Sequence, residues 1–339
     1  MTMACRPAVS SISLGSPSTH PLPLRLDQAA QHNLDIELFH DDILHLANSQ
    51  DHTTFPTDAL RQLAAASVIR SLCDERRIKI VSLQPFRHYE GLLDRAKHAQ
   101  RINEMKLWIK MAQVLNTDLI GIPSTFLPET ETSGDMDLIV GDLREVAELG
   151  ARSGIRFSYE ALAWGTHVDT WEKAWDAVRQ VDRANFGLCI DSFNLAGRVY
   201  ADPEAESGVT GDAVAAMQAT LERLAKIDVE KLFWVQVVDA ERLEAPLTPA
   251  SPYYVPGQAA RLSWSRNCRL FYGEGEMGGY LPVRDILEVV FVKLAFRGCV
   301  SAELFNRSLA DPDPGTPEKH ATRAAASFEK LVAEFWTEM

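Results

Sequence analysis

The sequence predicts an α/β fold, a single (β/α)8 TIM barrel formed by residues 1–339. Short runs of β-branched and aromatic residues alternate with longer segments whose apolar residues recur every three or four positions, a pattern typical of parallel strands joined by helices. Eight such runs favour a closed barrel, because an open doubly wound sheet usually has fewer strands and a glycine-rich first turn. The expected strands are Ala8 to Leu14, Leu34 to Phe39, Ile78 to Leu83, Leu119 to Ile122, Ile155 to Glu160, Phe186 to Asp191, Phe233 to Val238 and Cys299 to Leu304.

The connecting segments fit this architecture and mark no boundary between domains. Helical periodicity is clear in DALRQLAAASVIRSLCDER, AQRINEMKLWIKMAQVLN, GDLREVAELGARSG and DAVAAMQATLERLAKID. The proline-rich segment Glu244 to Pro256 follows the seventh expected strand, where a barrel places a long active-site loop. The GEGEMGG run near Glu274 follows no apolar strand, so we interpret it as a turn at the barrel rim rather than a dinucleotide-binding loop.

Composition and net charge favour a protein that acts on small molecules over one that binds nucleic acid or membranes. At 339 residues with 46% hydrophobic content, the chain is long enough for one large α/β barrel or two medium domains. Its formal net charge of −13 would repel nucleic acid and anionic membranes. We therefore expect a small-molecule substrate and neither of those partners, and we predict no particular oligomeric state.

Targeting signals and cysteine usage indicate a cytoplasmic protein. No apolar stretch approaches the roughly 20 residues that span a bilayer, and the N-terminal residues lack a signal-peptide pattern. The cysteines are odd in number, widely spaced and mostly set in apolar segments, which indicates free thiols rather than disulfides. They are Cys5, Cys73, Cys189, Cys268 and Cys299.

Polar residues close several of the expected strands, and a (β/α)8 barrel carries its catalytic groups at the carboxyl ends of its strands. Glu160 and Asp191 end two strands, the eighth strand carries Glu303, and the seventh carries Gln236 shortly before Asp239. Three carboxylates at one mouth would repel one another unless a cation or shared protons lay between them, and we favour a divalent metal. Oxygen donors without a thiolate or histidine favour Mg²⁺ or Mn²⁺, with Co²⁺ as a further candidate. For each residue taken singly, an ordinary solvated side chain is the alternative.

Three arginines predict an acidic substrate. Arg87 lies in LQPFRHYEG after the third expected strand, and Arg266 and Arg269 lie in SWSRNCRLF after the strand-seven loop. Guanidinium groups in rim loops would bind a carboxylate through paired hydrogen bonds, which indicates a small organic acid. Pairing with a surface acid is the alternative for each arginine.

Histidines are sparse, and two of them fall in expected strand-end loops. These are His88 and His167, and the second follows Glu160 closely in YEALAWGTHVDT. Because an imidazole titrates near neutral pH, His167 is a candidate proton carrier. A structural role in its loop is the alternative.

Several motifs resemble those of one family over essentially the whole chain. YEALAWGTHV, GLCIDSFN, VQVVDA, LQPFRHYEG, SWSRNCRLF and AELFN are similar to segments of the 3-dehydroshikimate dehydratases of quinate and shikimate catabolism, within the xylose isomerase-like TIM barrels. The resemblance implies metal-dependent dehydration of the ring carboxylate 3-dehydroshikimate to protocatechuate through a metal-stabilised enolate. It implies that Glu160, Asp191, Gln236 and Glu303 hold the metal. It also places Arg87, Arg266 and Arg269 in substrate-contacting motifs, without choosing between the last two as the carboxylate clamp.

The chain departs from this family pattern at two positions. Asn194 stands three residues after Asp191, where bacterial relatives typically carry histidine, and Asn267 replaces the histidine of a related SWSRH motif. An asparagine can bind substrate but cannot carry a proton at neutral pH. We therefore expect Asn194 to contact substrate, and Glu160, Glu303 and His167 all remain candidates for the general base.

Other functions on the same barrel are weaker alternatives. A sugar or sugar-phosphate isomerase or epimerase usually has a histidine ligand on strand seven, where this chain has Gln236. An abasic-site endonuclease would need more histidine ligands and a basic surface. A non-catalytic protein that binds small acids would not need to keep carboxylates at three strand ends.

Overall fold

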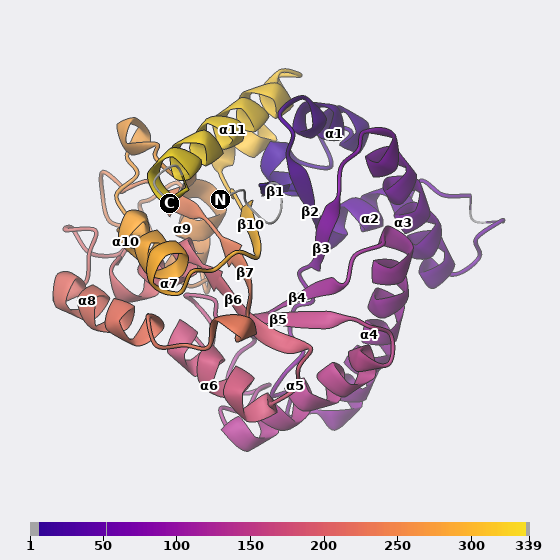
Figure 1. Cartoon of the computed structure of the whole chain (residues 1–339), viewed down its shortest axis with the longest axis horizontal. Coiled ribbons are helices and arrows are strands. Elements are labelled where there is room, and N and C mark those ends of the chain that lie inside the picture. Colours follow the sequence, from indigo (N-terminus) through magenta and orange to yellow (C-terminus); the bar gives the residue numbers. More distant parts are fainter. Residues whose placement is uncertain (1–6, 52, 337–339) are drawn as a thin grey trace.

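The computed structural model describes residues 7–51 and 53–336. Eight parallel strands close into a barrel in the order β1, β10, β7, β6, β5, β4, β3, β2, with helices around it (Figure 1). The predicted TIM barrel and its eight strands are confirmed, although residues 11–14 form a 3₁₀ turn instead of extending the first strand. The barrel strands are β1 Ala8–Ser10, β2 Asp35–Phe39, β3 Ile80–Gln84, β4 Leu119–Pro123, β5 Arg156–Glu160, β6 Phe186–Asp191, β7 Leu232–Gln236 and β10 Cys299–Ala302.

The strand register brings the polar strand ends to one side of the barrel. Glu160 on β5 lies beside Cys189 on β6, and Asp191 on β6 lies beside Gln236 on β7. On the other edge of β7, Gln236 pairs with Ser301 of β10. Because all these strands are parallel, their carboxyl ends and the side chains on them share one mouth.

The helices form the outer layer and cover the apolar outer faces of the strands. Several begin at a side-chain cap, including α7, where Asp191 accepts a hydrogen bond of 3.0 Å from the backbone N–H of Asn194. The last helix packs beside the first, which closes the ring (Figure 1). The helices are α1 Leu22–Gln31, α2 His40–Ala47, α3 Asp58–Glu75, α4 Arg95–Leu115, α5 Met136–Ala151, α6 Trp171–Val181, α7 Ser192–Val199, α8 Ala213–Leu224, α9 Ala260–Cys268, α10 Val283–Leu287 and α11 Thr316–Phe335.

The barrel interior holds one large aromatic ring among polar side chains. Trp234 of β7 is 1% exposed, and its indole N–H donates to Ser301 at 2.9 Å. Gly121 of β4 leaves space for this packing, because a Cβ there would lie 3.2 Å from the Trp234 ring and 3.0 Å from the Cβ of Gln84. The missing side chain thus lets both Gln84 and Trp234 pack close to the backbone of β4 inside the barrel.

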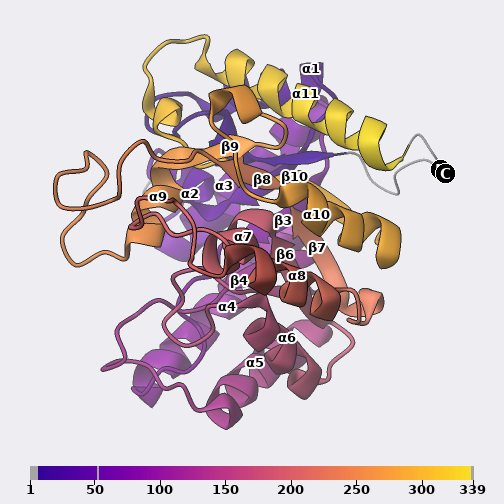
Figure 2. The ribbon, with the colours of Figure 1, turned by 90° about the vertical axis from the view of Figure 1, so that its left-hand side faces the viewer.

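A two-stranded antiparallel sheet lies outside the barrel and was not predicted. It pairs β8 (Val238–Ala240) with β9 (Arg269–Phe271). The expected seventh strand is therefore too long, since Val238 already belongs to β8. The expectation that Arg266 and Arg269 lie in rim loops is also wrong, because Arg266 lies on α9 and Arg269 begins β9. Residues 241–259, which include the expected proline-rich loop, contain no helix or strand and extend away from the barrel (Figure 2).

Two further expectations concern the chain as a whole. Within the described residues, no helix is both long enough and apolar enough to cross a membrane. The cysteines in that part of the chain form no disulfide, as predicted; they are Cys73, Cys189, Cys268 and Cys299. Cys5 lies outside the described residues.

Candidate active site

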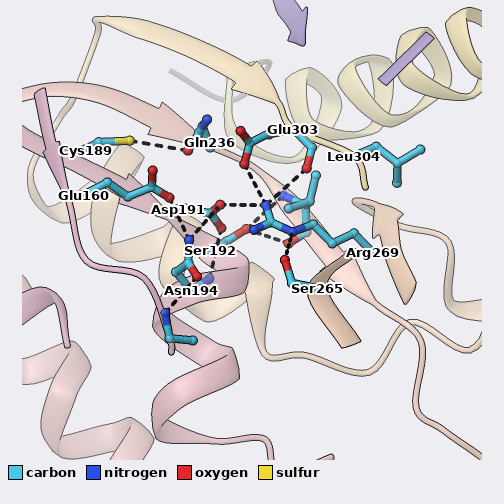
Figure 3. Close-up of polar contacts among 12 residues, drawn as sticks. Glu160, Cys189, Asp191, Ser192, Asn194, Gln236, Ser265, Arg269, Glu303 and Leu304 are labelled. Atoms are coloured by element: carbon cyan, nitrogen blue, oxygen red, sulfur yellow. Dashed lines mark hydrogen bonds and ion pairs between the residues drawn. The ribbon is translucent and has the colours of Figure 1, made fainter. Parts of the chain in front are cut away.

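Three buried carboxylates meet at the carboxyl end of the barrel (Figure 3). Glu160 ends β5, Asp191 ends β6, and Glu303 directly follows β10. One oxygen atom from each lies within 4.8 Å of the others, and none of the three residues is more than 6% exposed. The fold thus brings together three residues that the strand-end pattern predicts as metal ligands.

The carboxylate cluster carries a strong electrostatic penalty. Burial, and after it the charges of Asp191 and Glu303, raise the pKa of Glu160 well above its usual value. Burial raises the pKa of Glu303 to about 7, against the opposing effect of the Arg269 guanidinium. When ionised, the three carboxylates and Arg269 sum to −3 + 1 = −2, which one divalent cation would neutralise. This set of hard oxygen donors fits such a cation.

Arg269 lies between two of the carboxylates rather than at the rim. Its Nη1 donates to Asp191 Oδ2 at 2.8 Å and to Glu303 Oε2 at 3.0 Å, and its Nε donates to Ser265 at 3.1 Å. The side chain is 1% exposed, and its guanidinium lies 4.3 Å from the centre of the Phe193 ring. Arg269 therefore acts first as the internal countercharge of the cluster.

Asn194 also faces the carboxylates. Its Nδ2 donates to Glu160 Oε1 at 2.7 Å and to Asp191 Oδ2 at 3.3 Å, while its Oδ1 accepts a hydrogen bond of 3.0 Å from the Ala163 backbone. Asn194 is 3% exposed and is not part of the cavity wall. The structure thus places it as an orienting partner of two carboxylates, whereas the sequence predicts contact with substrate.

Gln236 and Asp239, the polar residues expected at the seventh strand, have separate surroundings. Gln236 is fully buried; its Nε2 donates to Glu37 at 3.2 Å and its Oε1 accepts from the Cys189 thiol at 3.5 Å. Asp239 lies on β8, where its Oδ1 accepts backbone N–H groups of Ala240, Tyr280 and Leu281 at 2.7–3.1 Å. Asp239 therefore fixes the loop at Tyr280 and Leu281, whereas Gln236 lies next to Asp191 of the carboxylate cluster.

Sequence reasoning missed Glu37. This residue of β2 is 0% exposed, and burial, followed by the charge of Glu303, raises its pKa well above the usual value. The signal in the sequence is the position of Glu37 between the apolar residues Ile36 and Leu38 in the strand run LDIELF. In a barrel strand, an acid between apolar neighbours points inward and requires polar partners there.

A cavity opens above the carboxylates. Glu160, Glu303 and Arg269 contribute its polar surface, together with Gln84 and Ser265. Its apolar walls come from Phe39, Phe126, Leu162, Trp164, Leu262 and Phe305. The cavity thus combines acidic groups with aromatic walls that suit a small ring.

Two of the three predicted arginines lie in the cavity wall at its exposed side. Arg87 and Arg266 are exposed, and both also line a wider surface hollow next to the cavity. Among the described residues neither forms an ion pair, and Arg266 donates only to Gln258 at 2.9 Å. Burial and then the charge of Arg87 lower the pKa of Arg266. Two guanidinium groups that repel each other across one space would bind an anion between them.

The two histidines do not line the cavity. His167 Nε2 lies 3.2 Å from the Thr132 hydroxyl, and the ring packs against Gly134. His88 packs edge-on against Phe126 with ring centres 4.4 Å apart, and burial lowers its pKa to about 4. Neither histidine makes a described contact with the carboxylate cluster.

The sequence matches the family model of the xylose isomerase-like TIM barrel over residues 26–331. The chain belongs to this family. A relative from Neurospora crassa named 3-dehydroshikimate dehydratase is 48% identical over 341 residues, 98% of this chain and 95% of the relative. A solved fusion of a xylose isomerase-like TIM barrel with 4-hydroxyphenylpyruvate dioxygenase is 27% identical with a TM-score of 0.71, covering 98% of this chain and 42% of that one. Another member of this fold, the IOLI protein with a bound zinc atom, has a TM-score of 0.72 at 17% identity, covering 98% and 100% of the two chains.

The buried position of Arg269 leads to a prediction on stability. In metal-free protein at pH 8, Arg269→Met should lower the free energy of unfolding by about 3–5 kcal/mol, because Asp191 and Glu303 lose their buried countercharge. At pH 5 the loss should be smaller, since the raised pKa values of Glu160 and Glu303 let these two carboxyls take up protons in the folded state, which lowers the negative charge of the cluster. Urea unfolding in the presence of a chelator measures both values. The exposed Arg266→Met is the matched control, with a change within about 0.5 kcal/mol; equal losses in the two variants would contradict the assignment.

Proposed function

We propose that this chain is a 3-dehydroshikimate dehydratase, a carbon–oxygen lyase that converts 3-dehydroshikimate to protocatechuate and water. The observation that carries the proposal is one cavity with buried carboxylates at its base and, at its exposed side, two arginines that form no ion pair with any described residue. A ring that bears one carboxylate and a ketone needs both features. The Neurospora crassa relative of that name supports the choice of substrate, because it matches 98% of this chain.

Arg87 and Arg266 would bind the carboxylate of the substrate. They are the two cavity arginines without an ion pair among the described residues, whereas Arg269 is engaged by Asp191 and Glu303. Between Arg266 and Arg269, the geometry therefore favours Arg266 as the clamp. Aromatic side chains such as Phe126 and Trp164 would pack on the ring and hold it over the carboxylates.

A divalent cation would be held by Glu160, Asp191, Gln236 and Glu303. The three carboxylates supply the charge, and the amide oxygen of Gln236 supplies a neutral donor. Oxygen donors favour Mg²⁺ or Mn²⁺, and Co²⁺ is also compatible with them. When bound, such a cation supplies Lewis-acid polarisation of the ring ketone.

The side chains of this chain would move the protons. Glu160 and Glu303 line the cavity, so either can take the ring proton next to the ketone, and we favour them over His167 on position. The neighbouring hydroxyl then leaves as water after it accepts a proton, and the loss of one water gives the aromatic product. Without a cation, burial raises the pKa of Glu303 to about 7 and that of Glu160 well above its usual value.

The activity itself is tested by adding 3-dehydroshikimate to purified protein and following protocatechuate by ultraviolet absorbance. Protein with Mg²⁺ or Mn²⁺ should form the product, and exhaustive chelation should abolish turnover reversibly, because the carboxylates would then lack their cation. Elemental analysis verifies removal of the metal. Full turnover by verified metal-free protein would refute the metal, and no turnover with any of Mg²⁺, Mn²⁺ and Co²⁺ would refute the substrate.

The carboxylate clamp predicts a loss in substrate recognition. Arg87→Met and Arg266→Met should each lower kcat/KM by about ten- to a hundredfold, mostly through KM, because a charge-assisted contact is lost. Steady-state kinetics measure the loss. Arg284→Met, an exposed arginine of α10 outside the cavity, is the control and should behave as wild type. Unchanged kinetics in both cavity variants would rule out the clamp.

The proton carrier is tested by three isosteric changes. His167→Gln should keep kcat/KM within about threefold and keep the acidic limb of its pH profile, since the ring is outside the cavity wall. Glu160→Gln and Glu303→Gln should each lose about 10²- to 10⁴-fold. Metal content is measured in every variant, so that loss of the cation is separated from loss of the base. A collapse of the rate and of the acidic limb in His167→Gln would instead identify His167 as the base.

A further inference from the structure

Glu37 lies inside the barrel, beneath the cavity, without being part of the cavity wall. It comes from β2, and polar side chains of three other strands point toward it: Gln84 of β3, Gln236 of β7 and Ser301 of β10. Ser301 lies 2.5 Å from Glu37 Oε2. The amide groups of Gln84 and Gln236 both donate to the other oxygen, Oε1. This one atom therefore accepts hydrogen bonds from two side chains near the carboxylate cluster.

The contact with Gln236 fixes the direction of an amide. Gln236 Nε2 donates to Glu37 Oε1 at 3.2 Å, which turns its Oε1 toward the Cys189 thiol at 3.5 Å. Figure 3 shows the contact of this end of Gln236 with Cys189, and the strand register pairs Gln236 with Asp191 of the carboxylate cluster. A reversed amide would place its oxygen against Glu37 and present N–H groups to the metal site, and an N–H group cannot bind a cation.

Gln84 is oriented by the same oxygen. Its Nε2 donates to Glu37 Oε1 and, at 2.8 Å, to Glu303 Oε1. The nitrogen therefore bridges two carboxylates, and the amide oxygen would repel both if it took that place. Because Gln84 contacts both Glu37 and Glu303, Glu37 also influences the position of Glu303.

We propose that Glu37 is a positioning residue whose Oε1 sets the orientation of the Gln236 and Gln84 amides, and so presents Gln236 Oε1 and Glu303 to the cation. The inference rests on the metal site of the proposed function. It assigns to Glu37 no contact with metal or substrate. The role depends on an acceptor atom at one position rather than on the negative charge of the side chain.

Two substitutions separate the acceptor from the charge. Glu37→Gln keeps an oxygen at the Oε1 position and can place its N–H groups toward Ser301, but it removes the charge. Glu37→Asp keeps the charge but withdraws the carboxylate from both amides by one methylene. If Glu37 acts through its charge, Glu37→Gln should weaken metal binding more than Glu37→Asp. If Glu37 acts by positioning the amides, Glu37→Asp should weaken it more.

The test is calorimetric titration of metal-free protein with Mn²⁺ alone, so its readout is independent of turnover. Glu37→Asp should weaken Mn²⁺ binding by about 10- to 100-fold, the usual effect of losing a partner that orients a ligand. Glu37→Gln should stay within about threefold of wild type. Weaker binding in Glu37→Gln than in Glu37→Asp, equal losses in both, or no change in either would overturn the proposal.

Matched controls come from another buried glutamate. Glu90 is 1% exposed and accepts hydrogen bonds from the Thr125 backbone at 2.6 Å and from Tyr159 at 3.0 Å. Glu90→Asp and Glu90→Gln should leave Mn²⁺ affinity unchanged, and thermal unfolding verifies that all four variants fold. Wild-type protein is titrated first: failure to bind Mn²⁺ would refute the metal site of the proposed function, whereas normal wild-type binding with the wrong order among Glu37 variants refutes the positioning role alone.

Discussion

Mutual repulsion among Glu160, Asp191 and Glu303 is the constraint on which the rest of the site depends. Three carboxylates with oxygen atoms inside 4.8 Å of one another cannot all ionise in a buried place without compensation. The surrounding residues supply that compensation within the chain: Arg269 donates to two of the carboxylates and Asn194 donates to two. What remains is a negative site open to a cavity, which is the arrangement that a cation-dependent enzyme requires.

The barrel strands and the long segment after β7 supply different parts of the site. The parallel strands fix the carboxylates, and Asp191 is held further because it also caps α7. The segment after β7 leaves the barrel, returns through α9 and pairs β9 with β8. This return places Arg269 inside the cluster and Arg266 at the exposed side of the cavity, only three positions apart in sequence. One insertion thus delivers both the internal countercharge and a binding group for an external anion.

The sequence predicts those parts of the site that depend on strand ends, and misses those that depend on pairing across the chain. Glu160, Asp191 and Glu303 could be found because any parallel strand brings its last residue to the mouth. Arg269 could not be placed, since its position follows from the antiparallel pairing of Asp239 with Leu270, which leaves no periodic signal. Glu37 escaped notice because its partners come from three other strands. His167 drew attention through nearness to Glu160 in sequence, yet the loop turns its ring toward Thr132.

Anomalous scattering from crystals grown with Mn²⁺ tests the central claim most directly. We predict one strong peak within coordination distance of oxygen atoms of Glu160, Asp191 and Glu303 and of Gln236 Oε1, with Arg269 still paired to Asp191. A second group of possible ligands in the described residues, His98, Asp142 and Glu145, should stay empty, because Arg95 already neutralises Asp142. A peak at that second group alone, or no peak at the strand ends at saturating Mn²⁺, would contradict the assignment of the carboxylates as a metal centre.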